Sequence, residues 1–166
     1  MNRSSFIRGA GLLSAGLIVA PNTILGQDKP AAYQSEVVSK FVGASHSDLA
    51  KVKELLAEYP NLIYSSWDWG GGDFETGIGA GGHVGNKDVV NFLLERGARP
   101  TIHALTMLGK TNLVKPILEE YPHLINSAGP HGFTLMHHAQ RGGDDSKEML
   151  AYLEEKGAKS GKLNLW

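Results

Sequence analysis

The chain has 166 residues, a formal net charge of −1 at pH 7 and no cysteine. Without cysteine it forms no disulfide and carries no lipid attached through a cysteine thioether. A nearly balanced charge also lacks the basic excess of nucleic-acid-binding domains, so we expect no nucleic-acid partner.

Residues 1–26 are predicted to be a secretory signal peptide. Arg3 and Arg8 precede an apolar stretch, residues 9–20, with no acidic side chain among them. This stretch is shorter than the roughly 20 residues of a membrane-spanning helix, so we expect no permanent membrane anchor. The segment around Arg3 resembles the bacterial twin-arginine export signal, except that Ser4 stands where the second arginine is expected. We therefore expect export to the bacterial periplasm, by the twin-arginine or the general secretion route.

Three segments are predicted after the signal peptide. Residues 27–34 are polar and contain a proline, which is typical of a short linker. Residues 35–160 are expected to form one domain, long enough to bury a core without disulfides. Residues 161–166 are expected to be a C-terminal tail, in which Trp166 either covers the apolar end of the domain or stays free for a partner.

Two short phrases alternate within the predicted domain. Glu-Tyr-Pro at residues 58–60 returns at residues 120–122, and Gly-Ala at residues 97–98 returns at residues 157–158. Each phrase follows an apolar run with helical spacing, so the pattern predicts about four helical repeats. The helices are expected to end near these phrases, at a proline or at a left-handed glycine.

The last repeat carries the clearest family resemblance. Residues 134–140, Thr-Leu-Met-His-His-Ala-Gln, resemble the ankyrin-repeat consensus Thr-Pro-Leu-His-Leu-Ala-Ala, and residues 100–103 are a looser copy. The resemblance implies an all-α ankyrin-repeat solenoid of about four helix-turn-helix repeats. It also implies a binding module that contacts other macromolecules through inter-repeat finger loops and a concave face. His103 and His137 match the structural histidine of that family.

The segment from residue 67 to residue 76 is the least like the consensus and predicts a binding surface. It combines two tryptophans with acidic side chains, the composition favoured at binding hot spots, although one tryptophan folding back into the core is an alternative. A second loop, residues 126–132, is expected on the same side. We predict a protein partner, and a cap on another exported protein would bind in the same way. The predicted binding residues are Trp67, Asp68, Trp69, Asp73, Glu75, His131 and His138.

Glycines are concentrated between residues 70 and 82. Gly79, Gly81 and Gly82 occupy the place of a helix, where each costs roughly 1 kcal/mol relative to alanine. They either lower the surface for a ligand or allow close helix packing. The Gly-x-Gly-x-x-Gly match in this segment follows no strand pattern, so we expect no dinucleotide site.

The seven histidines raise the question of a metal site, which Asp68, Asp73 or Asp144 would complete. The chain has no His-Glu-x-x-His motif and no nucleophile elbow, and His46 next to Ser45 does not supply the geometry of a triad. We therefore predict no catalytic residue, metal ligand or cofactor, and a binding module rather than an enzyme. The alternative left open is a periplasmic small-molecule- or metal-binding protein, or a metal-dependent hydrolase, that uses His and Asp side chains near the glycine-rich segment.

Overall fold

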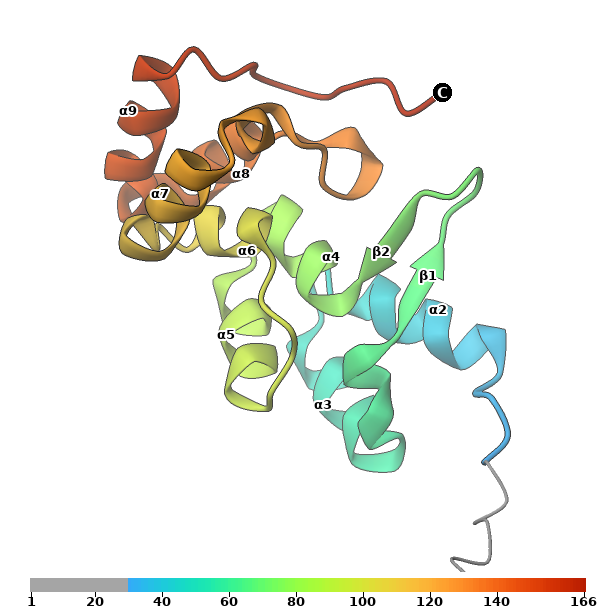
Figure 1. Cartoon of the computed structure of the whole chain (residues 1–166). Coiled ribbons are helices and arrows are strands. Elements are labelled where there is room, and N and C mark those ends of the chain that lie inside the picture. The colour runs from blue at the N-terminus through green and yellow to red at the C-terminus, as the bar shows by residue number, and fades with distance from the viewer. Residues whose placement is uncertain (1–29) are drawn as a thin grey trace, which may run out of the picture. The chain divides into compact units, whose positions relative to one another are not determined.

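Helices account for most of the chain between residues 30 and 166, the range that the computed structural model describes (Figure 1). The predicted signal peptide and the first residues of the linker lie outside this range. No helix within it is long and apolar enough to cross a membrane. The α-helices are α2 (Ser35–Ala44), α3 (Leu49–Glu58), α4 (Gly77–Val84), α5 (Lys87–Glu95), α6 (Ile102–Met107), α7 (Thr111–Glu120), α8 (Leu135–Gly142) and α9 (Lys147–Glu155). Short 3-10 helices are η1 (Pro60–Tyr64), η2 (Pro122–Asn126), η3 (Pro130–Gly132) and η4 (Gly143–Ser146).

Local sequence signals explain where several helices begin and end. Asp48, Asn86 and Thr134 each accept a hydrogen bond from a backbone N–H in the first turn of the helix that follows, which satisfies a donor that the helix leaves free. Helices α5 and α9 end just before Gly97 and Gly157, whose φ angles are 88° and 69°. The predicted helix ends at these two left-handed glycines are confirmed.

The segment predicted as a projecting loop is a β-hairpin. Strand β1 (Ser66–Asp68) pairs antiparallel with β2 (Phe74–Thr76), with Trp67 opposite Glu75. Residues 70–72 between the strands are glycines with φ angles of 127°, 64° and 88°, and Asp68 Oδ1 accepts hydrogen bonds from the first and third of them at 2.8 and 3.2 Å. Aromatic and β-branched residues on both sides of a glycine turn are a hairpin signal.

The prediction of an all-α ankyrin-repeat solenoid is therefore wrong. The structure is mostly helical but contains this two-stranded sheet, and its helices do not indicate a solenoid. In a solenoid each repeat contacts only its neighbours. Here α4 packs directly against α8, two helix pairs further along the chain, and His137 Nε2 lies 2.8 Å from the carbonyl oxygen of His83.

The hydrophobic core forms two clusters, and the first includes residues of α4 and of the hairpin. The first surrounds Phe41, Leu62 and Leu93 and includes the partly buried Trp67, while the second surrounds Leu135 and Leu153. Trp67 is therefore the tryptophan that packs onto the core, as the alternative interpretation of this segment expected. Its burial anchors the start of the hairpin to the helices.

Close packing explains the glycines of α4. A β-carbon on Gly77 would lie 2.9 Å from the ring of Phe41, and one on Gly79 would lie 2.9 Å from the ring of Pro130. Both distances are shorter than ordinary van der Waals contact. The structure therefore favours close helix packing over a surface lowered for a ligand as the reason for these glycines. Gly79 in particular allows the η3 segment to lie against α4, which brings His131 to the site described next.

Candidate metal centre

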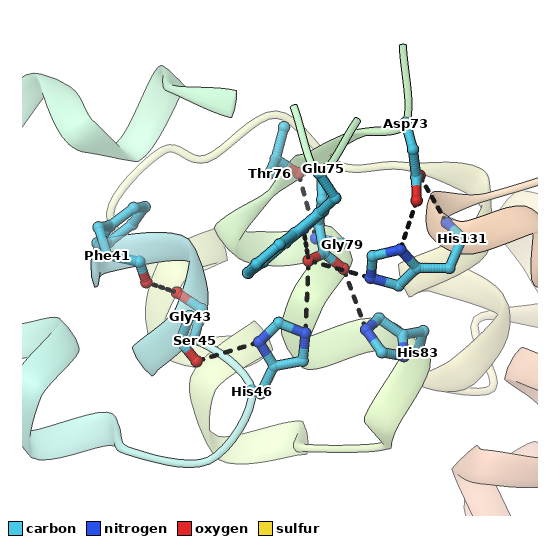
Figure 2. A network of polar contacts seen from close by, with 11 residues as sticks. Phe41, Gly43, Ser45, His46, Asp73, Glu75, Thr76, Gly79, His83 and His131 are labelled. Carbon is cyan, nitrogen blue, oxygen red and sulfur yellow. Dashed lines mark hydrogen bonds and ion pairs between the residues drawn. The ribbon is translucent and has the colours of Figure 1, made fainter. Parts of the chain in front are cut away.

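Four potential metal ligands converge between the hairpin and the helices (Figure 2). They are His46 in the turn after α2, Glu75 on β2, His83 on α4 and His131 in η3. One donor atom from each lies within 4.8 Å of the others. Glu75 is at the centre: its Oε1 is 3.0 Å from His83 Nε2, and its Oε2 is 3.4 Å from His46 Nε2 and 3.5 Å from His131 Nε2.

Burial divides the four side chains into an inner and an outer pair. The side chains of Glu75 and His83 are 0% and 10% exposed, whereas those of His46 and His131 are 25% and 22% exposed. An isolated charge at the position of Glu75 would be costly without a compensating cation. The outer pair faces solvent, so an ion has a way in on that side.

His46 is oriented by a backbone contact. Its Nδ1 lies 3.0 Å from the carbonyl oxygen of Gly43. A carbonyl oxygen only accepts hydrogen bonds, so Nδ1 carries the proton. In the neutral ring the remaining nitrogen, Nε2, then holds a lone pair, and this lone pair is directed at Glu75.

Asp73 orients His131 through two hydrogen bonds. Its Oδ1 accepts the backbone N–H of His131 at 2.8 Å, and its Oδ2 accepts Nδ1–H at 2.6 Å. Burial raises the pKa of the Asp73 carboxyl, but these bonds outweigh that effect and hold its pKa below the usual value. His131 has a φ of 57°, which is unusual for a residue other than glycine, and such strain persists only where the surroundings enforce it. Its Nε2 is thereby fixed on the side that faces Glu75.

The hydrogen-bonding groups of the cluster are not all satisfied when the rings of His46 and His131 are neutral. Glu75 Oε2 accepts Trp69 Nε1–H at 2.9 Å, but a carboxylate has no proton for the lone pairs of His46 and His131. Glu75 Oε1 and His83 Nε2 are buried and form no hydrogen bond within the described part of the chain. Protonating His46 and His131 would supply those protons and would place two positive charges beside the carboxylates of Glu75 and Asp73. A bound cation satisfies all the facing lone pairs at once.

The distances agree with that interpretation. Zinc lies about 2.0–2.1 Å from histidine nitrogen and carboxylate oxygen, which places tetrahedral ligands about 3.3 Å from one another. The three distances from Glu75 oxygens to ring nitrogens, 3.0, 3.4 and 3.5 Å, lie close to this spacing. All four donor atoms lie within 4.8 Å of one another.

Aromatic rings line the cluster on both sides. The ring of Trp69 lies 6.3 Å from that of His46 and 6.0 Å from that of His131. Phe133 stacks on His83 at 5.2 Å on the inner side. The inner ring excludes water from the buried ligands, while the half-exposed Trp69 borders the open side.

The structure gathers some of the predicted binding residues at this centre and not others. Trp69, Asp73, Glu75 and His131 meet here. Asp68 instead shapes the turn of the hairpin, and Trp67 packs on the core beside Trp69. His138 is fully buried elsewhere, with Nδ1 donating to the carbonyl oxygen of Thr134 at 2.8 Å. The prediction that these residues bind a partner stays a prediction.

His46 and His83 were not predicted as ligands. The four ligand residues come from separate segments, and no local spacing of the metal-binding kind connects them. Of the aspartates considered for a metal site, only Asp73 reaches the cluster, and it does so as a partner of His131. Asp144 instead pairs with Lys147 at 2.9 Å on the surface.

No protein-family model, curated protein or solved structure matches the chain.

Proposed function

We propose that this protein binds one divalent transition-metal ion through His46, Glu75, His83 and His131. The observation that carries the proposal is the pair of imidazole lone pairs, fixed by Gly43 and Asp73, that face a fully buried carboxylate. Imidazole and carboxylate ligands without a thiolate suit zinc, copper(II), nickel and iron(II) better than calcium or magnesium.

Outer contacts of the ligands support the same function. Metal-binding histidines commonly donate their second ring N–H to a carboxylate or a backbone carbonyl, which orients the ring and makes it a better ligand. Asp73 serves His131 in this way, and the carbonyl of Gly43 serves His46. Trp69 donates to Glu75 Oε2 and limits the orientations of that carboxylate.

Such an ion would join segments that are far apart in the sequence. The ligands come from the turn after α2, the hairpin, α4 and η3. Because this arrangement exists only in the folded chain, the free energy of metal binding adds to the free energy of unfolding. A free metal concentration 100 times the dissociation constant would add about 2.7 kcal/mol.

A metal titration of the full chain tests the proposal. We expect one equivalent of Cu²⁺ to bind and to quench tryptophan fluorescence, because Trp69 lies beside two ligands, and we expect Zn²⁺ to raise the melting temperature. His83→Gln is expected to remove both effects. His123→Gln changes an exposed histidine on η2 and serves as the matched control. Equal metal binding by the wild type and His83→Gln would show that the cluster is not the site.

We also propose that the chain is exported to the bacterial periplasm, as its first residues predict. A metal centre without cysteine ligands is compatible with an oxidising compartment, because imidazole and carboxylate are not altered by thiol oxidation. Fractionation of cells that produce the full chain measures this directly. Retention of the uncleaved chain in the cytoplasm would contradict export.

Binding of a protein partner is the second candidate function. Phe74 on the hairpin is 62% exposed and Trp166 at the end of the tail is 76% exposed, and aromatic side chains of this kind serve as anchors at interfaces. We expect proteins retained from a periplasmic extract by the wild type to be lost with Phe74→Ala. Leu113→Ala removes an exposed apolar side chain on α7 and is the control. Equal retention by both variants would contradict a hairpin-centred interface.

A further inference from the structure

We infer that the metal centre takes a small carboxylate-bearing ligand with an apolar body, held in a cavity between His131 and the C-terminal tail. The inference rests on the proposed metal binding. The cavity has a volume of about 380 Å³, and its lining includes Asp73, His131, Lys162, Leu163, Leu165 and Trp166. It therefore borders one metal ligand and the residue that orients this ligand.

The metal centre has room for a further ligand on its outer side. Glu75 and His83 close the inner side, whereas His46 and His131 remain partly exposed. Protein metal sites that leave a coordination position to solvent accept water or a substrate there, and zinc, copper and iron all adopt higher coordination numbers than four. One carboxylate from Glu75 leaves a divalent ion with a net positive charge, which favours an anion as the added ligand.

Lys162 gives the cavity its own preference for an anion. Its ammonium group lies 5.5 Å from the centre of the Phe133 ring and forms no ion pair with a carboxylate of residues 30–166. Asp73, which lines the same cavity, already accepts two hydrogen bonds from His131. A ligand carboxylate can therefore pair with Lys162 without breaking an ion pair of residues 30–166, although the ammonium group also lies near the Phe133 ring and contributes to the lowered pKa of Asp73.

Backbone contacts hold the tail in place beside the metal centre. Leu163 N–H donates to the carbonyl oxygen of Gly132 at 2.8 Å, and Thr134 N–H donates to the carbonyl oxygen of Gly161 at 3.1 Å. These bonds flank Lys162, which itself pairs with Phe133 in an isolated antiparallel bridge. Figure 1 shows the tail leaving α9 and running past this segment toward the hairpin. The backbone of Lys162 is thus held beside Phe133, two residues after His131 in the sequence.

The tail also supplies an apolar wall. Leu163, Leu165 and Trp166 line the cavity, and the Trp166 ring lies 3.5 Å from the position that a β-carbon on Gly71 would occupy. Trp166 is nevertheless 76% exposed, so a ligand that covers it removes apolar surface from water. A carboxylate with an aromatic or branched apolar body matches this lining better than acetate does.

The experiment uses the full chain loaded with Co²⁺, whose visible absorption reports ligands added to the metal. We expect benzoate to change this spectrum with an affinity about tenfold higher than that of acetate, because its ring covers apolar surface. Benzyl alcohol, which has the ring but no carboxylate, is expected to leave the spectrum unchanged. Trp166→Ala should reduce the advantage of benzoate over acetate.

Lys162→Gln tests the charge contribution. We expect it to weaken benzoate binding roughly 2- to 5-fold, the range for an exposed ion pair, without changing Co²⁺ loading. Lys159→Gln removes a neighbouring exposed lysine that does not line the cavity and should have no effect. The same benzoate affinity in Lys162→Gln as in the wild type would overturn the role of this cavity.

The outcomes separate this inference from the proposed function. A Co²⁺ spectrum that forms but does not respond to benzoate overturns the carboxylate ligand and leaves metal binding intact. Equal benzoate binding by the metal-free chain, measured by calorimetry, also overturns it, because the ion would then play no part. Absence of the Co²⁺ spectrum overturns both proposals together.

Discussion

Glu75→Gln is expected to weaken metal binding by about a hundredfold or more and, at the same time, to leave the metal-free protein as stable as the wild type or more stable. Removing a ligand costs at least as much affinity as the 10- to 100-fold that is typical of outer contacts. In the metal-free chain, however, the new amide can donate a hydrogen bond to a ring nitrogen such as His83 Nε2, which forms no hydrogen bond with residues 30–166 although it lies 3.0 Å from Glu75 Oε1. Satisfying a buried polar atom of this kind is worth about 1–3 kcal/mol.

Whether Glu75→Gln stabilises or destabilises the metal-free protein distinguishes two interpretations of the cluster. If Glu75 only formed ion pairs with protonated histidines, its replacement would leave buried charges uncompensated and would cost about 3–5 kcal/mol. Thermal unfolding of Glu75→Gln with EDTA measures the stability of the metal-free protein, and thermal unfolding with Zn²⁺ measures the stabilisation by the metal. Glu119→Gln, on the exposed face of α7, is the control. A strongly destabilised metal-free Glu75→Gln would contradict the metal centre and favour the ion pairs.

Acidification is expected to destabilise the protein through His138, by about 1.4 kcal/mol for each pH unit below about 6.5. Burial lowers the pKa of His138 to about 3, and the hydrogen bond to the carbonyl oxygen of Thr134 opposes this only in part. Between the folded and unfolded pKa values the unfolded chain binds a proton that the folded chain does not. The contribution of neutral His138 is therefore complete above pH 6.5 and decreases as the pH falls toward 3.

Denaturant unfolding of the wild type and His138→Gln at pH 7, 6 and 5, in EDTA, measures this dependence. The free energy of unfolding of the variant should fall less steeply with decreasing pH, because its side chain does not titrate. Burial also lowers the pKa of His103 and His137, so a weaker dependence will remain in the variant. His123→Gln should keep the slope of the wild type. Parallel slopes for the wild type and His138→Gln would contradict a buried neutral ring.

The sequence predicted local features of the fold better than its long-range contacts. Helix ends at Gly97 and Gly157 follow from residues within one turn, because glycine adopts the left-handed conformation easily. The hairpin was missed because the glycines at residues 70–72 were interpreted as part of a projecting loop. The contact between α4 and α8 depends on packing across the whole domain, and no repeat spacing reveals it.

The candidate site was predicted only in part, because it too depends on contacts between distant segments. The tryptophan-rich segment attracted attention by its composition, and it contributes Trp69, Asp73 and Glu75. His46 and His83 have ordinary local surroundings in the sequence. Only the folded chain places their Nε2 atoms against Glu75, and only the hydrogen bonds at Nδ1 of His46 and His131 reveal which ring nitrogens carry protons.

The absence of a side chain at Gly79 matters when this candidate site is sought in other sequences. A β-carbon at residue 79 would lie 2.9 Å from the ring of Pro130, and His131 follows Pro130 directly. Alanine at this position would retain all four donor residues, but it is expected to push Pro130, and with it His131, away from α4. An inventory of histidines and carboxylates alone would therefore miss whether another chain can bring the four side chains together. The glycine, which touches no ion, is the more discriminating marker.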